Sequence, residues 1–420
     1  VPVTASDFVC SWLRVLDPKN RLTVTTGLYD VKGGRAYKRG ELSDPDQVGV
    51  RAIDPYTLEV ELEGPTGFFP YLLTQPLCLP VPKHIVDQHG DSWEKIENFV
   101  SNGPFRLTSW VPGENIILDR NPTYHGGSFG NIQRMELLII SDPEERLQLY
   151  ETDGLDVLRL EPAIDYAQQR HSGEYISGPS LNSSYLRFKV DTPPFTDPQV
   201  RQAFVMAINR ETLASVVLKG YHAPAMGGYV PPGIPGYSPD IGLPFNPELA
   251  RQLLAQAGFP DGQGLPEMEL TANFDNQTMA EFIVTQLSQH LNVNINIQVL
   301  EWGDFLNNLD VTHLLLARWV ADYPDPDNFL RVSMTRRIGN WNEPYINLLE
   351  EARRLTNQGE RMNLYHQADK ILVEEAAIMP VTYARFHLLV KPWVKNLAKS
   401  SLDFWTCKDA IIEPFDTGAS

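Results

Sequence analysis

Residues 268–299 read MELTANFDNQTMAEFIVTQLSQHLNVNINIQV, and this stretch decides the fold class. Residues 268–272 have the length and apolar content of a strand, and apolar side chains then recur at helical spacing over 279–291. Residues 293–299 alternate strictly between aliphatic and amide side chains, as a half-buried strand does. A strand, a helix and a strand in this length predict a βαβ unit with parallel strands, and therefore an α/β protein.

The next apolar stretch, residues 314–319, predicts a buried strand that leads into the sequence RWVADYPDPDNF at 318–329. Ligands of open α/β sheets bind beyond the carboxyl ends of such strands. This segment places three aromatic and three acidic side chains beside two prolines, so it can direct a fixed carboxylate toward a cationic ligand group. The alternative is a helix-capping turn with solvated acidic residues, and the residues alone do not separate the two interpretations.

The composition excludes several classes of protein. The chain has 420 residues and 53 acidic against 35 basic side chains, and its net charge of −18 argues against a nucleic-acid or anionic membrane partner. The apolar content of 42% is typical of a globular protein. Three cysteines, Cys10, Cys78 and Cys407, are too few for a disulfide scaffold.

Sequence motifs for catalysis are missing. The chain has no P-loop, no G-x-G-x-x-G after a predicted strand, no G-x-S-x-G and no H-E-x-x-H. His84 and His89 form the closest histidine pair, but their spacing does not suit a shared helical face. We therefore expect no catalytic residue, no metal site and no cofactor.

Short motifs in a shared order along nearly the whole chain resemble the extracytoplasmic solute-binding proteins of family 5, which include the oligopeptide- and dipeptide-binding proteins of ABC importers. Each motif is short, and their order carries the resemblance. The motifs lie at residues 2–8, 11–12, 54–62, 102–105, 119–124, 195–203, 207–210, 246–254, 257–259, 319–322, 325–326 and 379–383.

The resemblance implies a two-lobed, periplasmic-binding-protein-like α/β fold of type II, cluster C, with an accessory subdomain. Residues 1–103 would be the remnant of that subdomain, residues 104–200 with 386–415 would form lobe I, and residues 201–385 would form lobe II. Family members carry roughly eighty to a hundred residues before the first helix of this chain. We therefore expect that the amino-terminal part of the fold is missing from it.

The function implied by the resemblance is reversible binding of short peptides between two lobes, without chemistry. Asp322 matches the carboxylate that pairs with the free amine of a peptide, and residues 183–185 match a strand whose edge would pair with its main chain. For Trp302, Trp319 and Tyr383, core packing is the alternative to lining the cleft. The ligand-binding residues expected from the resemblance are Asp322, Trp319, Trp302, Tyr323, Ser183, Ser184, Tyr185 and Tyr383.

The expected partners are a peptide or small-molecule ligand and an ABC permease complex, with no nucleic acid. The expected location is extracytoplasmic, in the periplasm or on the outer face of the cytoplasmic membrane, with any lipid anchor outside this chain. The alternative function is a ligand-sensing domain of a larger regulatory protein. Relatives also bind sugars, nickel complexes and opines, so the fold leaves the ligand open.

Overall fold

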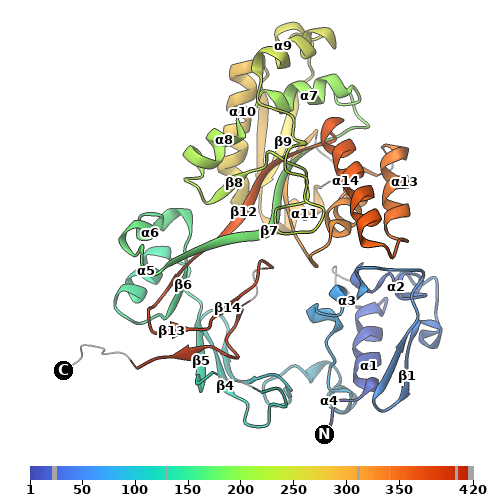
Figure 1. Ribbon diagram of the computed structural model, residues 1–420, viewed down its shortest axis with the longest axis vertical. Helices are drawn as coiled ribbons and strands as arrows, with labels where there is room; N and C mark the ends of the chain where they lie inside the picture. Colours follow the sequence, from blue (N-terminus) through green and yellow to red (C-terminus); the bar gives the residue numbers. More distant parts are fainter. Residues whose placement is uncertain (21–25, 128–129, 310–312, 340, 403–404, 415–420) are drawn as a thin grey trace. The chain divides into compact units, whose positions relative to one another are not determined.

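The chain folds into two compact units. The computed structural model describes residues 1–20, 26–127, 130–309, 313–339, 341–402 and 405–414. The first unit combines Val1–Ser177 with His387–Ser420, and the second is Gly178–Phe386. The chain passes from one unit to the other inside two long strands, β7 (Tyr175–Phe188) and β12 (Ile378–Val390) (Figure 1).

The boundaries between the units differ from those expected near residues 200 and 385. The second passage lies at 386/387, close to the expected position, whereas the first lies at 177/178. The earlier boundary follows from the length of β7, because most of this strand belongs to the sheet of the second unit.

The second unit is built on a mixed sheet in the order β10-β9-β11-β7-β12, with β8 beside β12. The predicted βαβ unit is confirmed: β9 and β10 run parallel, Met268 lies opposite Ile295, and a helix connects them. Strand β11 is parallel to β9 and antiparallel to β7. The remaining bounds in the sheet are β8 His222–Pro224, β9 Met268–Asn273, β10 Ile295–Leu300 and β11 Leu314–Val320.

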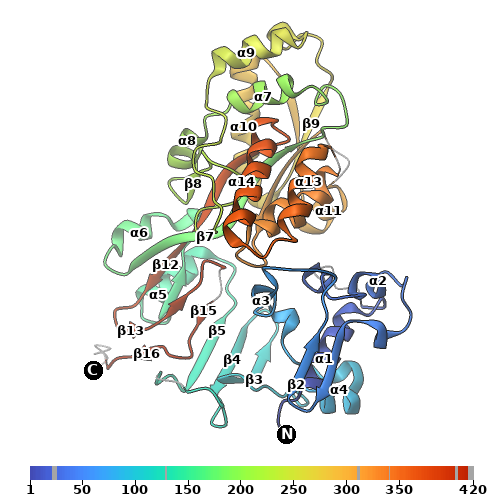
Figure 2. The same ribbon diagram turned by 45° about the vertical axis from the view of Figure 1, so that its right-hand side comes forward.

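Helices cover both faces of this sheet (Figures 1 and 2). On one face, alternate strand residues such as Leu270 and Leu316 pack with α7, α9 and α10 in one apolar core. Helices α13 and α14 lie on the opposite face. The helices of the unit are α7 Pro198–Met206, α8 Arg210–Thr212, α9 Pro247–Gln256, α10 Gln277–Leu291, α11 Trp302–Asn307, α12 Thr335–Ile338, α13 Glu343–Ala352 and α14 Gln358–Glu374, with π-helical turns at Leu213–Val217 (η6) and Asn328–Ser333 (η9).

The first unit begins with α1 (Ala5–Leu16), which a capping box starts. The Asp7 carboxylate accepts a hydrogen bond of 2.7 Å from the Thr4 N–H, the reciprocal half of a capping box. Trp12 is buried in a separate core with residues such as Leu16, Val48 and Cys78, and its indole N–H donates to the Cys78 carbonyl at 3.0 Å. Residues 1–103 therefore contain an apolar core of their own.

The rest of the first unit is made of short elements. A three-stranded antiparallel sheet, β3-β4-β5, follows the first core, and β6 pairs with the end of β12. The bounds are α2 Gly34–Lys38, β1 Val50–Asp54, β2 Thr57–Val60, α3 Phe69–Leu72, α4 Lys83–His89, β3 Phe105–Val111, β4 Asn115–Arg120, β5 Arg134–Leu138, α5 Pro143–Glu151, β6 Val157–Arg159, α6 Tyr166–Arg170, β13 Val394–Lys395, β14 Ala398–Lys399, β15 Trp405–Thr406 and β16 Ile411–Ile412.

The alternation of buried and exposed side chains at the second strand of the βαβ unit, β10, can be tested by mutation. Ile295 is buried against the core, whereas its neighbour Asn294 is exposed. Ile295→Ala should lower the free energy of unfolding by about 2 kcal/mol, the lower end for a buried aliphatic truncation, because β10 is an edge strand that can relax. Asn294→Ala should change it by less than about 0.5 kcal/mol. Equal shifts of the denaturant midpoint in the two variants would show that Ile295 and Asn294 are not assigned correctly to the buried and exposed faces.

Candidate functional site

The loop after β11 holds the predicted anchor residue in a defined orientation. Asn328, the first residue of η9, contacts Trp319 and Asp322 through one side-chain amide. Its Oδ1 accepts from the Trp319 indole N–H at 2.7 Å and from the Asp322 N–H at 3.0 Å, and its Nδ2 donates to Asp322 Oδ2 at 3.0 Å. Trp319 and Asp322 are both half-buried. The structure therefore brings these two predicted residues together.

The other acidic residues of the loop serve a different purpose. Asp325 is paired in two hydrogen bonds with the buried Arg361, at 2.7 and 2.5 Å. Asp327 pairs with Arg331 and also accepts from the Tyr323 and Tyr365 hydroxyls, at 2.8 and 2.9 Å. Of the three acidic residues, only Asp322 keeps an exposed surface, and the alternative of a turn with solvated acids is wrong for the other two.

The electrostatics of Asp327 follow from these contacts. Burial alone would raise the pKa of this carboxyl, but the Arg331 guanidinium and the donated hydrogen bonds outweigh burial and hold the pKa below its usual value. An ionised, fully bonded Asp327 fixes the backbone directly before Asn328. The buried ion pairs thus define the backbone from which the anchor is positioned.

Strand β7 places Ser183, Ser184 and Tyr185 beside the anchor strand. Ser183 lies opposite Trp319, Ser184 opposite Arg318 and Tyr185 opposite Ala317. The expectation of an open strand edge at 183–185 is wrong, because β7 lies between β11 and β12 in the sheet. All three side chains are buried, and the Ser183 hydroxyl donates to the Tyr229 carbonyl at 2.9 Å.

The remaining three predicted residues are Tyr323, in the same loop as Asp322, and Tyr383 and Trp302, on other elements. Tyr323 and Tyr383 are buried, and their hydroxyls donate within the unit, that of Tyr383 to the Gly228 carbonyl at 2.6 Å. Trp302, at the start of α11, is 53% exposed and stacks on Phe305 with ring centroids 5.8 Å apart. Trp302 therefore has the surface that a ligand contact needs, whereas the two tyrosines stabilise the protein interior.

Sequence reasoning missed three residues of this region. Asn328 carries no pattern that separates it from other loop asparagines. The Arg337 guanidinium carbon lies 5.8 Å from the Trp319 ring centroid and 5.7 Å from that of Tyr185, a pair of cation–π contacts. Tyr229, on the proline-rich segment after β8, links Ser183 to the interior. No local signal could have found the last two, because their partners are distant in sequence.

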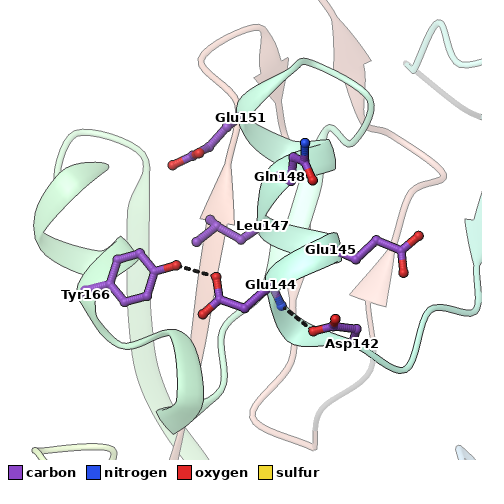
Figure 3. Close-up of a pocket in the computed structure, with 7 residues that line it drawn as sticks. All are labelled: Asp142, Glu144, Glu145, Leu147, Gln148, Glu151 and Tyr166. Carbon is purple, nitrogen blue, oxygen red and sulfur yellow. Dashed lines mark hydrogen bonds between the residues drawn. The ribbon is translucent and has the colours of Figure 1, made fainter.

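A second feature lies in the first unit, where acidic side chains line a shallow hollow on α5 (Figure 3). Asp142 caps the helix by accepting from the Glu144 N–H at 2.9 Å, and Glu144 accepts from the Tyr166 hydroxyl at 2.5 Å. This hollow contains none of the predicted ligand residues. Its lining residues are Asp142, Glu144, Glu145, Leu147, Gln148, Glu151 and Tyr166.

The described ranges contain neither a metal-binding cluster nor a membrane-spanning helix. Within them, no group of three or more His, Cys, Asp or Glu side chains is arranged to hold a metal ion. Among the helices described, none combines the length and the apolar character that crossing a bilayer requires.

Comparison with curated proteins identifies relatives over almost the whole chain. The probable deoxycholate-binding periplasmic protein YgiS of Escherichia coli is 33% identical over 410 residues, which cover 94% of this chain and 76% of that protein. The dipeptide-binding protein DppE of Bacillus subtilis is 30% identical, with 96% and 77% covered. The periplasmic oligopeptide-binding protein OppA of Escherichia coli is also 30% identical, with 94% and 75% covered.

Solved structures agree with these relatives. The murein tripeptide-binding protein MppA of Escherichia coli superposes with a TM-score of 0.82 at 28% identity, covering 98% of this chain and 84% of that one. OppA of Burkholderia pseudomallei gives 0.78 at 28% identity, covering 96% and 84%. These structures confirm the expected two-lobed α/β fold. Residues 1–340 match the family described as "Bacterial extracellular solute-binding proteins, family 5 Middle", and the chain belongs to this family of extracellular solute-binding proteins.

Proposed function

We propose that this protein is the extracytoplasmic receptor of an ABC-type importer and that it binds short peptides through their free amine. The observation that carries the proposal is the Asp322 carboxylate, which is half-exposed, held at two points by Asn328 and adjacent to an aromatic ring. Relatives named as dipeptide-, oligopeptide- and murein peptide-binding proteins support it.

The roles of the predicted residues follow from their exposure. Asp322 would pair with the ligand's ammonium group, and Trp319 and Trp302 would contact apolar parts of the ligand. The buried side chains of Ser183, Ser184, Tyr185, Tyr323 and Tyr383 would support the site from within the second unit. In this proposal binding is reversible, no bond of the ligand is broken, and an ABC permease receives it.

A second ligand class has one observation in its favour. The relative YgiS is named as a probable deoxycholate-binding protein, and the exposed Trp302 would suit an amphipathic, largely apolar ligand. Deoxycholate is an anion, however, and a carboxylate anchor would repel it. Asp322 therefore favours a ligand with a positive charge.

Titration calorimetry tests this proposal. The purified protein is titrated with a pool of free tri- to pentapeptides and, separately, with deoxycholate. We expect heat from the peptides at micromolar concentration, intact peptides on recovery, and no heat from the bile salt at the same concentration. Binding of deoxycholate alone, or hydrolysis of the peptides, would overturn the proposal.

A further inference from the structure

We infer that Asn328 is a positioning residue for ligand recognition: its amide orients the Asp322 carboxylate toward the ligand's ammonium group and fixes Trp319 beside it. This inference rests on the proposed peptide-binding function and assigns the orientation of the anchor to one buried side chain. Asn328 is fully buried, so it acts on a ligand only through its hydrogen-bond partners Trp319 and Asp322.

The hydrogen bonds define what the amide does. The indole N–H of Trp319 can only donate and the Asp322 carboxylate can only accept, so the orientation of the Asn328 amide is fixed by its partners. Both acceptor sites of its Oδ1 are used, by Trp319 and by the Asp322 N–H. Asp322 is therefore held through its backbone and through its carboxylate by the same planar group.

The position of Asn328 is fixed in turn by the buried groups next to it. The preceding residue, Asp327, is ion-paired with Arg331 and hydrogen-bonded to two tyrosine hydroxyls. A carboxylate held in place before the ligand arrives loses little conformational freedom on binding, and this preorganisation increases affinity.

The chemistry requires an amide at this position. An aspartate could still accept from the Trp319 and Asp322 N–H groups, but it would replace the Nδ2 donor by a second carboxylate oxygen about 3 Å from Asp322. Two carboxylates at that separation cannot both ionise readily, so near neutral pH they would share one proton. A serine would remove the donor without adding a charge.

The test compares peptides with a free and an acetylated amino terminus by calorimetry at pH 6 and pH 8. The wild type should prefer the free amine by roughly 30-fold or more at both pH values, the effect of a lost charge contact. Asn328→Asp should reduce this ratio at least about tenfold at pH 6, with partial recovery at pH 8 as the shared proton is lost. Asn296→Asp, on the exposed face of β10, is the charge-matched control and should behave as the wild type does.

The outcomes separate this inference from the proposed function. If the wild type binds both peptides equally, Asp322 is not an amine anchor and the proposed function itself fails. If the wild type prefers the free peptide and Asn328→Asp keeps the same preference at pH 6, Asn328 does not position Asp322. A melting curve establishes that each variant folds, and Asn328→Ser replaces the aspartate variant if that one does not. In an Asp322→Asn background, Asn328→Asp should cause no further loss of discrimination.

Discussion

Replacing Arg361 with methionine is expected to lower the free energy of unfolding by about 3–5 kcal/mol, because it leaves the Asp325 carboxylate buried without its cation. Arg361 and Asp325 are 1% and 2% exposed, and two hydrogen bonds of 2.7 and 2.5 Å connect them. The pair joins α14 to the loop that carries Asp322. The loss should therefore appear in denaturant unfolding and also as weaker ligand binding.

Two matched variants make this test specific. Arg354→Met removes an exposed arginine that pairs with Glu350, and it should change stability by less than about 1 kcal/mol. Asp325→Asn combined with Arg361→Met removes both charges, while the asparagine oxygen can still accept from the Asp327 N–H as Asp325 does at 3.0 Å. The double variant should be more stable than Arg361→Met alone. If it is less stable, an unpaired charge is not the cause.

Asp369, on α14, is expected to make the protein less stable at pH 8 than at pH 5. Burial raises the pKa of this carboxyl from 3.8 to about 7, against the smaller opposing effect of hydrogen bonds from the Tyr229 and Val230 N–H groups. Its Oδ1 accepts from Tyr229 at 2.8 Å, and its Oδ2 has no hydrogen-bond partner.

The sign of the effect follows from proton binding. Between pH 4 and pH 7 the folded state retains a proton that the unfolded chain has released, so stability falls as pH rises through this window and is constant above it. The total contribution is about 4 kcal/mol, at about 1.4 kcal/mol per pKa unit. The tyrosines near Asp369, including Tyr237, Tyr383 and Tyr345, have pKa values that burial raises above 10, so they stay neutral between pH 4 and pH 8.

Comparing Asp369→Asn with the wild type separates the ionisation of Asp369 from that of every other group. The asparagine keeps the acceptor for the Tyr229 N–H but cannot ionise, so its stability relative to the wild type should rise by about 3 kcal/mol between pH 5 and pH 8. Asp240→Asn, at an exposed position of the same unit, should show no such difference. Parallel pH profiles for Asp369→Asn and the wild type would refute the assignment.

The βαβ unit could be predicted because its signals are local. The alternation over residues 293–299 and the apolar stripe over 279–291 each report one element through its own period. The C′ residue Gly258 likewise has a φ of +94°, the left-handed conformation that ends α9. Local patterns of this kind do not depend on the rest of the fold.

The long strands β7 and β12 could not be predicted from such patterns. Strand β7 spans Tyr175–Phe188, and nearly every residue from 180 onward is buried, so no alternation remains in the sequence to mark the strand. An interior strand covered on both faces has a continuous run of buried side chains. The length of β7 also explains why the boundary between units lies at 177/178.

The candidate site was predicted in part. Asp322 and Trp319 could be selected because they follow a buried strand and match family motifs. Asp325 and Asp327 could not be separated from Asp322, since the partner of Asp325 lies on a helix that begins 33 residues later, at Gln358. The role of Asn328 depends on a π-helical turn, which has no reliable sequence signal.

Calorimetric titration of the wild type and Asp322→Asn with one tripeptide, in free and amino-acetylated forms, tests the central claim most directly. The wild type should bind the free peptide at least about 30-fold more tightly than the acetylated one, because only the free peptide has an ammonium group for Asp322. Asp322→Asn should bind both forms with the weak affinity of the acetylated peptide. Equal affinity of the wild type for the two forms, or an unchanged preference in Asp322→Asn, would contradict the assignment of Asp322 as the amine anchor.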